Sequence, residues 1–361
     1  MMPVKPCTGC IFVVKYLYES ILKAGYKMIS EVYNQSQFLT VKAAYLYYIK
    51  GIPQSKIARK LNISVPTVSR LLNKAREDKI IEFVIKDPYL ECIELEQELM
   101  NRFGLKEVII AADPIENKIE EKEENPDSHK KLVALEGARY LQRIIKDEDV
   151  LGIAFGRTMY YMIHYLNPCQ KVNAQFVTLH GGLNNLSDEL DVASLTRRMA
   201  MAFGGENKIL YTEGFSSNEN LTSQIKEEKN VKKTIDRFKN VTISVTGIGS
   251  FYPDLKSLLV SYDFLEEEEL NHLIDNGVVG DMALRFFDVD GNECNTDFKD
   301  RTISIDFESY KNIPLKIVMV SGVNKTQTVM SALKGKLIDV LITNYSLGKS
   351  ILESTYFDSD V

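Results

Sequence analysis

The sequence predicts an α/β protein with an N-terminal three-helix, winged helix-turn-helix domain and a C-terminal domain built on a mostly parallel sheet. Three observations lead to this fold class. Two short amphipathic helices joined by a tight turn occupy Gln54–Asn73. From Val108 onwards, short apolar strands alternate with helices, as in a sheet covered on both faces. Small or polar residues follow several of these strands, at the edge where such sheets bind ligands.

The composition is that of an ordinary globular chain. Of 361 residues, 45% are apolar, and no run of about 18 apolar residues occurs, so we expect no membrane span. The apolar stretch Ile11–Val14 is interrupted by Lys15, unlike a signal peptide. Five cysteines, an odd number, favour a reducing, cytoplasmic setting. Because Cys7 and Cys10 have no second ligand pair, we expect neither a metal site nor a cofactor.

The first residues fit neither domain. We expect residues 1–27 to be a leader that is either disordered or mis-annotated, with the true start at Met28. Phe38–Lys50 is a predicted helix with apolar residues spaced for burial, and a glycine and a proline end it. This helix supports the two that follow, which predicts a helix-turn-helix domain over residues 28–87.

The stretch Gln54–Asn73 carries the local signals of a helix-turn-helix. Ala58 is small where two helices must approach closely, and Asn62 tolerates the positive φ that the turn often needs. Ser64 is a natural N-cap, and Pro66 falls in the first turn of the second helix. This pattern indicates a DNA-binding protein, whereas the alternative is an ordinary helical hairpin.

The outward face of the second helix carries hydrogen-bonding and cationic side chains, the groups that contact base edges and phosphates. The predicted contacts with double-stranded DNA are Gln54, Ser55, Ser64, Pro66, Thr67, Ser69, Arg70, Asn73 and Lys74. The net charge is −6, yet residues 38–86 hold ten Lys/Arg and three Asp/Glu, so the remainder carries −13. A basic block on an acidic body suits one DNA-facing module.

Two further elements connect this module to the second domain. Ile80–Ile85 is β-branched and aromatic and is predicted as a strand, the wing. Tyr89–Phe103 is a predicted amphipathic helix, and Gly104 is a natural residue to end it. We expect residues 88–104 to form a linker helix. Its near-heptad spacing leaves two roles open, which are dimerisation and packing on the next domain.

Residues 105–361 are predicted to form an effector-binding and oligomerisation domain. The predicted strands are Val108–Ala112, Val150–Phe155, Gln175–Leu179, Lys208–Thr212, Val241–Thr246, Lys316–Val320 and Val340–Thr343. The predicted helices are Lys131–Ile145, Arg157–Leu166, Val192–Phe203, Ser223–Phe238, Glu266–Asp275, Thr326–Lys334 and Leu347–Leu352.

Glycines and cations follow four of the strands. The four segments are Gly156-Arg157-Thr158, His180-Gly181-Gly182, Gly247-Ile248-Gly249 and Ser321–Lys325. Glycine lets backbone N–H groups approach an oxyanion, and a helix N-terminus and a cation add favourable charge. These loops predict a site for a phosphorylated small molecule, although each glycine also fits a simple tight turn. Asp281 and Asp288 are candidates to bind sugar hydroxyls, and Asp288–Gly291 also fits a β-turn.

From about Phe38 to Leu352, the sequence resembles the SorC-type sugar-binding transcriptional regulators of bacteria, which include deoxyribonucleoside and central glycolytic regulators. The matching segments, in order, are AAYLYYIKGIPQSKIARKLNISVPTVSRLLNKARE, LEQELMNRFGLKEVII, GIAFGRT, LHGGL, GIGS, GVVGDMALRFFDVDG and LKGKLIDVLITN. The resemblance implies a C-terminal domain similar in fold to sugar-phosphate isomerases and deaminases. It also implies a repressor or activator, often tetrameric, that responds to a phosphorylated sugar.

The resemblance implies an effector site as well. The phosphate- and sugar-binding positions of the family map onto Gly156, Arg157, Thr158, Gly181, Gly182, Gly249, Asp281, Asp288 and Lys325. His180 stands where the family more often has a polar amide. We therefore expect a homo-oligomeric, non-enzymatic DNA-binding regulator, a repressor, controlled by a sugar phosphate. The alternatives are a sugar-phosphate isomerase or deaminase carrying a helix-turn-helix, and a plain DNA-binding protein whose body only assembles.

Overall fold

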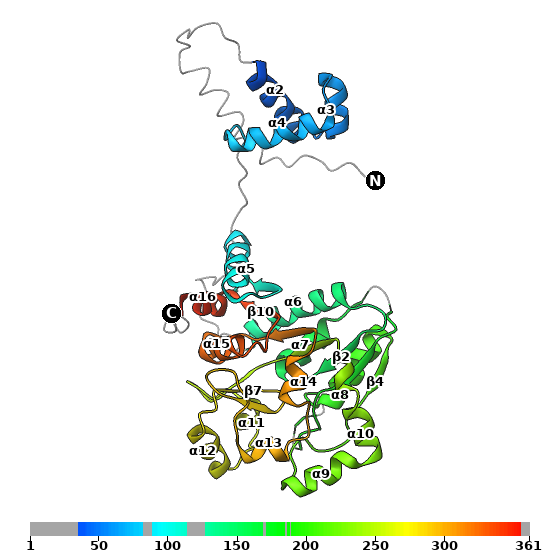
Figure 1. The fold of residues 1–361 in the computed structure, drawn as a ribbon, viewed down its shortest axis with the longest axis vertical. Helices are drawn as coiled ribbons and strands as arrows, with labels where there is room; N and C mark the ends of the chain where they lie inside the picture. The colour runs from blue at the N-terminus through cyan, green and yellow to red at the C-terminus, as the bar shows by residue number, and fades with distance from the viewer. Residues whose placement is uncertain are drawn as a thin grey trace, which may run out of the picture. The chain divides into compact units, whose positions relative to one another are not determined.

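The computed structural model describes residues 35–81, 89–113, 127–168, 171–184, 186–187 and 189–354. The chain divides into two compact units, residues 1–84 and residues 85–361, and each is described by itself (Figure 1). The predicted leader, residues 1–27, lies outside the described ranges. Within those ranges, none of the helices has the length and apolar character needed to cross a membrane.

The first unit is the predicted three-helix domain. Its elements are α2 (Gln35–Ala44), a π-helical turn η1 (Tyr45–Ile49), α3 (Gln54–Leu61) and α4 (Val65–Glu77). Ile57 and Val68 are fully buried between the helices and form their common core with Leu72. Asn62 adopts φ 55°, as predicted for the turn, and Ser64 caps α4 by accepting the Thr67 N–H. The helix-turn-helix predicted from the apolar spacing is therefore present.

The predicted wing cannot be compared over most of its length. Residues 82–85 of the predicted strand Ile80–Ile85 lie outside the described residues. Ile80 and Ile81 are described, and both pack against the core of the three helices rather than in a strand.

The second unit is built on a seven-stranded sheet in which every neighbouring pair is parallel, as predicted. Its strand order is β1 (Glu107–Ala111), β10 (Val340–Asn344), β9 (Leu315–Met319), β5 (Ile243–Thr246), β2 (Val150–Ile153), β3 (Gln175–Thr178) and β4 (Glu206–Lys208).

Helices cover both faces of this sheet (Figure 1). One apolar layer contains α6 (Ser128–Ile144), α7 (Arg157–Tyr165) and α8 (Val192–Phe203). The opposite layer contains α5 (Tyr89–Phe103), α10 (Lys229–Ile235), α14 (Phe307–Lys311), α15 (Thr326–Lys334) and α16 (Tyr345–Glu353). Side chains of a strand alternate between the two layers, so that Val340 and Ile342 join the first layer and Leu341 joins the second.

Helix α5 packs on the second unit. Its buried side chains Cys92, Leu95 and Leu99 belong to the same apolar cluster as β1 and α16. Gly104 follows with φ 65°, the left-handed conformation expected after a helix. Of the two roles left open by its sequence, packing is therefore observed, while dimerisation remains a prediction.

The second unit also contains a smaller antiparallel sheet, whose strands lie between β5 and β9 in the sequence. Its strands are β6 (Gly249–Ser250), β7 (Gly280–Met282) and β8 (Arg285–Phe287), and its surrounding helices are α11 (Leu258–Ser261), α12 (Glu267–Asp275) and α13 (Asp297–Arg301). The remaining elements are α9 (Glu219–Glu227) and the single 3₁₀ turns η2 (Phe238–Asn240) and η3 (Val323–Lys325).

Two predicted elements were wrong in extent. The strand predicted at Lys208–Thr212 is instead β4, at Glu206–Lys208. The chain after β4 leaves the sheet because its backbone bonds elsewhere: Leu210 N–H donates to Thr178 Oγ1, and Thr212 O accepts from Gly182. The helix predicted at Ser223–Phe238 is two helices, α9 and α10, separated where Glu228 adopts ψ 130°.

Candidate functional site

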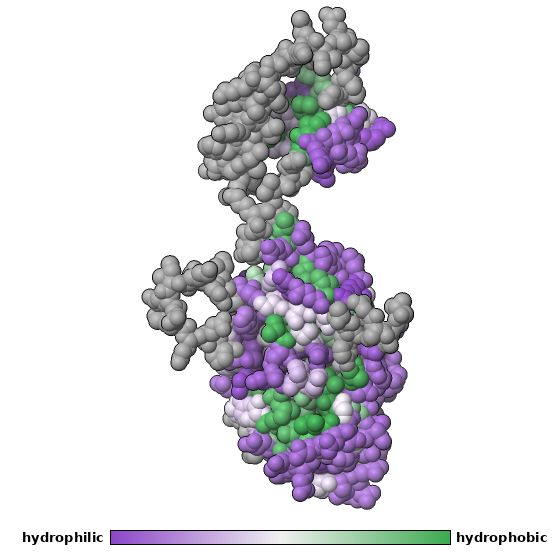
Figure 2. All heavy atoms as spheres, turned by 90° about the vertical axis from the view of Figure 1, so that its left-hand side faces the viewer, coloured by the Kyte–Doolittle hydropathy of each residue, from purple (hydrophilic) through white to green (hydrophobic). Residues whose placement is uncertain are grey.

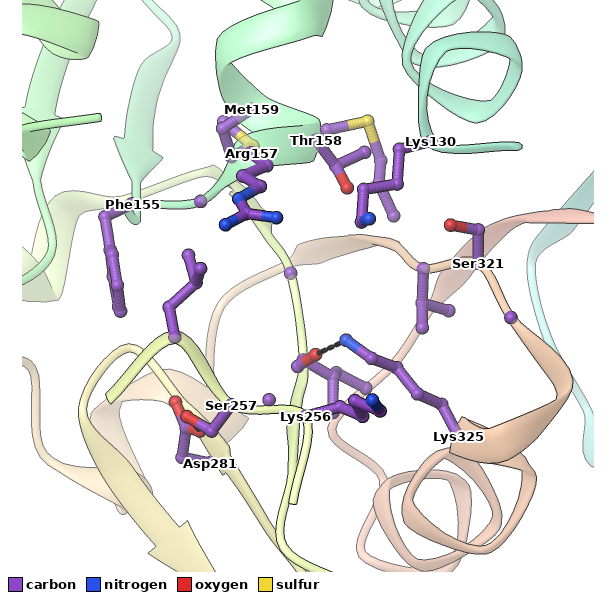
Figure 3. A pocket seen from close by; sticks show the side chains of 18 of the residues that line it. Lys130, Phe155, Arg157, Thr158, Met159, Lys256, Ser257, Asp281, Ser321 and Lys325 are labelled. Carbon is purple, nitrogen blue, oxygen red and sulfur yellow. Dashed lines mark hydrogen bonds between the residues drawn. The ribbon is translucent and has the colours of Figure 1, made fainter. Parts of the chain in front are cut away.

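The strand order places a crevice beside β2. From this strand, β3 and β4 lie on one side and β5, β9 and β10 on the other. Connections leaving β2 and β5 therefore diverge, which opens a crevice at the carboxyl ends of the strands. A cavity of about 360 Å³ occupies it, lined by residues that follow β2, β5 and β9 (Figure 3).

Four cationic side chains from separate segments line this cavity: Lys130, Arg157, Lys256 and Lys325. Figure 3 shows the Arg157 guanidinium and the Lys325 ammonium group pointing into it from opposite sides. Lys130 is held by Asp127, whose carboxylate lies 2.6 Å from its Nζ. Asp281 is the acidic residue of the lining. The cavity is therefore electropositive, which suits an anionic ligand.

The start of α7 adds to this positive charge. Gly156 precedes the helix with φ 145° and ψ 154°, a conformation that is almost restricted to glycine. Arg157 and Thr158 form the first turn, whose backbone N–H groups have no partner within the helix. The helix dipole therefore favours an anion where Gly156, Arg157 and Thr158 line the cavity. The Arg157 guanidinium lies 5.9 Å from the centre of the Tyr262 ring, which helps to orient it.

Burial shifts the pKa of both charged residues on the opposite side. It lowers the pKa of Lys325 to about 8, and the Asp281 carboxylate partly opposes that shift. Burial also raises the pKa of Asp281 to about 6, partly opposed by the hydroxyl of Ser257, which donates to Asp281 Oδ1 at 2.6 Å, and by Lys325. The Lys325 ammonium donates to Ile248 O at 2.5 Å. Both side chains are thus held in place. Because burial disfavours the charged form of each, an additional charged or polar partner would stabilise that form.

Gly249 has a steric reason to be glycine. It pairs with Asp281 in the small sheet. A Cβ atom at this position would collide with the Asp281 carboxylate and lie 2.8 Å from Ser257 Oγ. The absence of a side chain therefore lets Asp281 and Ser257 reach the cavity wall.

Of the nine effector residues predicted from the sequence, the structure brings six together at the cavity: Gly156, Arg157, Thr158, Gly249, Asp281 and Lys325. Gly181 and Gly182 do not line it, because their N–H groups donate to Ile303 O and Thr212 O. Asp288 does not line it either. Its carboxylate accepts the N–H groups of Asp290 and Asn292, so it stabilises the turn that was the alternative for this segment.

His180 is a structural residue in this fold. It is fully buried, and burial lowers its pKa to about 4, so the ring is neutral. Its Nε2 accepts the Phe155 N–H at 3.1 Å, and its Nδ1 lies 2.7 Å from Gly181 O, to which it donates. The ring thereby fixes the backbone immediately before Gly156.

Several residues that line the cavity were not among the predicted effector residues: His129, Lys130, Lys256, Ser257, Ser261 and Asn324. The predicted effector loops all directly follow strands. His129 and Lys130 begin α6, and Lys256 and Ser257 lie in an irregular segment between β6 and α11. Asn324 was within the identified loop after β9, but its amide gave no separate signal.

The predicted DNA-contact residues lie on the accessible side of the first unit. Ser55, Ser64, Pro66, Arg70, Asn73 and Lys74 are exposed, and Gln54, Thr67 and Ser69 are half-buried. Arg70 lies along α4 from Thr67, whose hydroxyl accepts from its guanidinium at 3.5 Å. None of these nine side chains is acidic, and such a surface is suited to contact with a polyanion such as DNA.

Among the described residues, no cluster of three or more histidine, cysteine, aspartate or glutamate side chains is arranged to hold a metal ion. Cys92 and Cys294 are buried free thiols, whereas Cys7 and Cys10 lie outside the described residues.

The chain matches a family model described as "Putative sugar-binding domain" over residues 87–353. It is 28% identical over 323 residues to the deoxyribonucleoside regulator of Bacillus subtilis, a match that covers 88% of this chain and 98% of that protein. It is 27% identical over 318 residues to the sorbitol operon regulator of Klebsiella pneumoniae, covering 87% and 98%. The crystal structure of full-length SorC from Klebsiella pneumoniae superposes with a TM-score of 0.67 at 26% identity, covering 89% of this chain and all of that one.

These matches confirm the resemblance found in the sequence. The similar proteins are regulators by name, so the alternative of a sugar-phosphate enzyme is not supported. The family model covers most of the chain, and the full-length matches extend into the helix-turn-helix unit. The chain therefore belongs to the SorC-type family of sugar-binding transcriptional regulators.

Proposed function

We propose that this protein binds an operator in double-stranded DNA through α4 and binds a phosphorylated sugar in the cavity of its second unit. The sugar phosphate sets the affinity for the operator. The protein acts as a repressor of genes for sugar or nucleoside catabolism and works as a homo-oligomer.

The observation that carries the proposal is the charge of the cavity. Four cations and the N-terminus of α7 surround a space of about 360 Å³ that contains one carboxylate, Asp281. A phosphomonoester carries about −1.5 to −2 charges at pH 7 and presents three acceptor oxygens. Arg157, Lys325 and the first-turn N–H groups of α7 supply donors for it. Asp281 and Ser257 supply an acceptor and a hydroxyl for the sugar.

The names of the relatives support a sugar-derived effector. One relative is a deoxyribonucleoside regulator and another is a sorbitol operon regulator. We infer that the effector of this chain carries a phosphate group, because an uncharged polyol would leave the four cations of the cavity without an anionic partner.

The surface of the second unit supports assembly into a homo-oligomer. Figure 2 shows hydrophobic side chains gathered on the face that carries α12 and α15. Large apolar side chains exposed on this unit include Ile274, Val289 and Val323. A gathering of apolar side chains such as the one in Figure 2 often marks a protein interface. A dimer would present two copies of α4 to half-sites about 34 Å apart.

The mechanism is thermodynamic linkage. A sugar phosphate that binds one arrangement of the second unit better than another shifts the population between them. If only one arrangement holds the two DNA-binding units at the operator spacing, the effector changes DNA affinity by the same factor by which DNA changes effector affinity.

A thermal-shift panel tests the effector assignment. The purified chain is heated with the phosphates of deoxyribose, ribose, sorbitol and glucose, and with the same sugars without phosphate. We expect one or more phosphates to raise the Tm by several degrees, because a ligand at 100 times its Kd stabilises by about 2.7 kcal/mol. The unphosphorylated sugars should have no effect.

Variants locate the site. Arg157→Met and Lys325→Met should abolish the shift, while Lys229→Met, which removes an exposed cation from α10, should retain it. All three should still bind DNA in a mobility-shift assay. A normal thermal shift in both cavity variants would exclude this cavity as the phosphate site.

A further inference from the structure

A polar junction at the carboxyl edge of the sheet lies outside the roles assigned above. Asp113 follows β1, and each of its carboxylate oxygens is engaged. Oδ1 accepts from Asn344 Nδ2 at 2.8 Å and lies 3.2 Å from His129 Nδ1. Oδ2 accepts from the Ser346 N–H at 2.8 Å and from the Ser346 hydroxyl.

One side of this junction reaches the cavity. Asn344 is buried, with 1% of its surface exposed, and its Oδ1 accepts the Gly322 N–H at 3.1 Å. Gly322 and His129 both line the cavity, the first from the loop after β9 and the second from the start of α6. A single carboxylate therefore restrains two separate segments of the cavity wall.

The other side of the junction reaches α5. Ser346 lies in the first turn of α16, so the Asp113 carboxylate acts as a cap for that helix and interacts favourably with its dipole. The neighbouring Tyr345 hydroxyl donates to Glu91 Oε2, on α5, at 3.0 Å. In the sequence, α5 is the helix that follows the DNA-binding unit.

We propose that Asp113 is a positioning residue for the effector cavity and that, through α16, it transmits the state of the cavity to α5. It holds the Gly322 loop through Asn344, holds His129 directly, and anchors the start of α16, whose Tyr345 is tied to α5. The transmission rests on the proposed function, whereas the positioning does not.

The physical basis is the number of donors that converge on one carboxylate. Asn344, the Ser346 N–H and the Ser346 hydroxyl donate to it, and only a group with acceptors on both oxygens satisfies them. In Asp113→Asn, one oxygen becomes an NH₂ group, which cannot accept from the Asn344 amide or from the Ser346 N–H, although the Ser346 hydroxyl can turn and accept from it. Whichever bond the NH₂ group cannot make is lost, and the loss of the negative charge weakens the bond that remains, so both the Asn344 link and the α16 cap are affected.

Hydrogen exchange of the full chain tests the positioning without any ligand. In Asp113→Asn, amides of residues 320–326 and of the first turns of α5 should exchange about ten times faster, as expected when a charged hydrogen bond is lost. In Tyr345→Phe, α5 alone should exchange faster. Tyr165→Phe, which removes a hydroxyl at the end of α7, should change neither segment.

The outcomes separate the two halves of the inference. Unchanged exchange at residues 320–326 in Asp113→Asn overturns the positioning role, and unchanged exchange in α5 overturns the transmission. If Asp113→Asn does not fold, Ser346→Ala replaces it. That variant removes one donor and leaves the backbone donor, so we expect an acceleration of about threefold in the same two segments.

Titration with inorganic phosphate adds a functional readout. We expect about tenfold weaker phosphate binding in Asp113→Asn and wild-type binding in Tyr345→Phe, measured by calorimetry. In Tyr345→Phe, phosphate should alter operator affinity by a smaller factor than in the wild type, and an unchanged factor would contradict transmission through α16. If the wild-type protein binds neither phosphate nor any sugar phosphate, the proposed function fails, while the exchange experiment still decides the role of Asp113.

Discussion

At the residue scale, the cavity holds charges that burial disfavours. Asp281 and Lys325 have pKa values shifted towards each other, to about 6 and about 8, and burial is the main cause of each shift. Burial therefore disfavours the charged form of each group, and a ligand with an anionic group beside Lys325 and a hydroxyl beside Asp281 would offset both effects. For His180, burial lowers the pKa to about 4 and keeps the ring neutral. The neutral ring accepts the Phe155 N–H and donates to Gly181 O, so it serves as a fixed donor and acceptor.

The Asp281 shift predicts a pH dependence of stability. The carboxyl group binds its proton more tightly in the folded state, with a pKa of about 6 against an ordinary 3.8. The folded state therefore binds more protons between about pH 4 and 6, and stability falls as pH rises through that window. We expect Asp281→Asn, which lacks this titration, to gain about 2 to 3 kcal/mol relative to the wild type from pH 4 to pH 7.

Urea unfolding of both proteins across this pH range measures the difference. A constant difference in the free energy of unfolding would show that Asp281 titrates normally.

The pKa shift of Lys325 has the opposite effect on stability, and it acts at higher pH. Its lowered pKa makes the unfolded state bind more protons between about pH 8 and 10.5, so stability rises with pH there.

At the element scale, the hairpin of β7 and β8 shows strain next to the cavity. Two residues connect these strands, Ala283 and Leu284, with φ of 50° and 66°. Such a two-residue turn favours glycine or asparagine, because a Cβ is disfavoured at positive φ. Leu284 is fully buried in the apolar cluster of the small sheet, and Ala283 lines the cavity. Packing thus holds a turn that local preference opposes.

Ala283→Gly should therefore stabilise the protein. Relief of the left-handed alanine is worth about 1 to 2 kcal/mol, and the greater freedom of glycine in the unfolded chain removes about 0.4 to 1 kcal/mol of it. We therefore expect a net gain of between about 0 and 1.6 kcal/mol in urea unfolding. Leu284→Gly is the matched comparison. It should destabilise by several kcal/mol, because it removes a buried side chain. A loss of stability in Ala283→Gly would show that the turn is unstrained.

At the scale of the whole molecule, charge separates the two functions. Residues 38–86 carry ten basic and three acidic residues, whereas the net charge of the chain is −6. The basic block coincides with the helix-turn-helix, and the acidic body carries the cationic cavity as a local exception. In the proposed function, DNA binding and effector binding therefore depend on different residues in different units.

Arg70→Ala should weaken DNA binding by about tenfold or more and leave the effector-induced thermal shift unchanged, because Arg70 is exposed on α4. If Arg70 contacts a phosphate, the slope of log affinity against log salt should fall by about 1. Filter binding at several salt concentrations measures both quantities. Arg139→Ala, which removes an exposed arginine from α6, should leave DNA affinity unchanged. Equal effects of the two variants would place the DNA-binding surface elsewhere.

Much of the architecture could be predicted because it depends on local patterns. The apolar spacing within Gln54–Asn73 predicts two packed helices, and the structure buries Ile57, Val68 and Leu72 between them. The positive φ of Asn62 and the Ser64 cap follow from the chemistry of those side chains. The alternation of strands and helices predicts a parallel sheet for the same reason. Arg157 and Thr158 were found because a glycine, a cation and a helix start follow one another directly in the chain.

Which residues line the cavity depends on the tertiary structure. Gly156 and Gly181 follow strands in the same way, yet one lines the cavity and the other bonds to Ile303. Lys130 and Lys256 join the cavity from segments that no strand precedes directly. The sequence by itself determined the helix-turn-helix, the parallel sheet and the edge at which the cavity lies, because the periods of helices and strands record local burial. Strand order decided which loops meet at that edge, since it depends on contacts between distant segments that no local pattern contains.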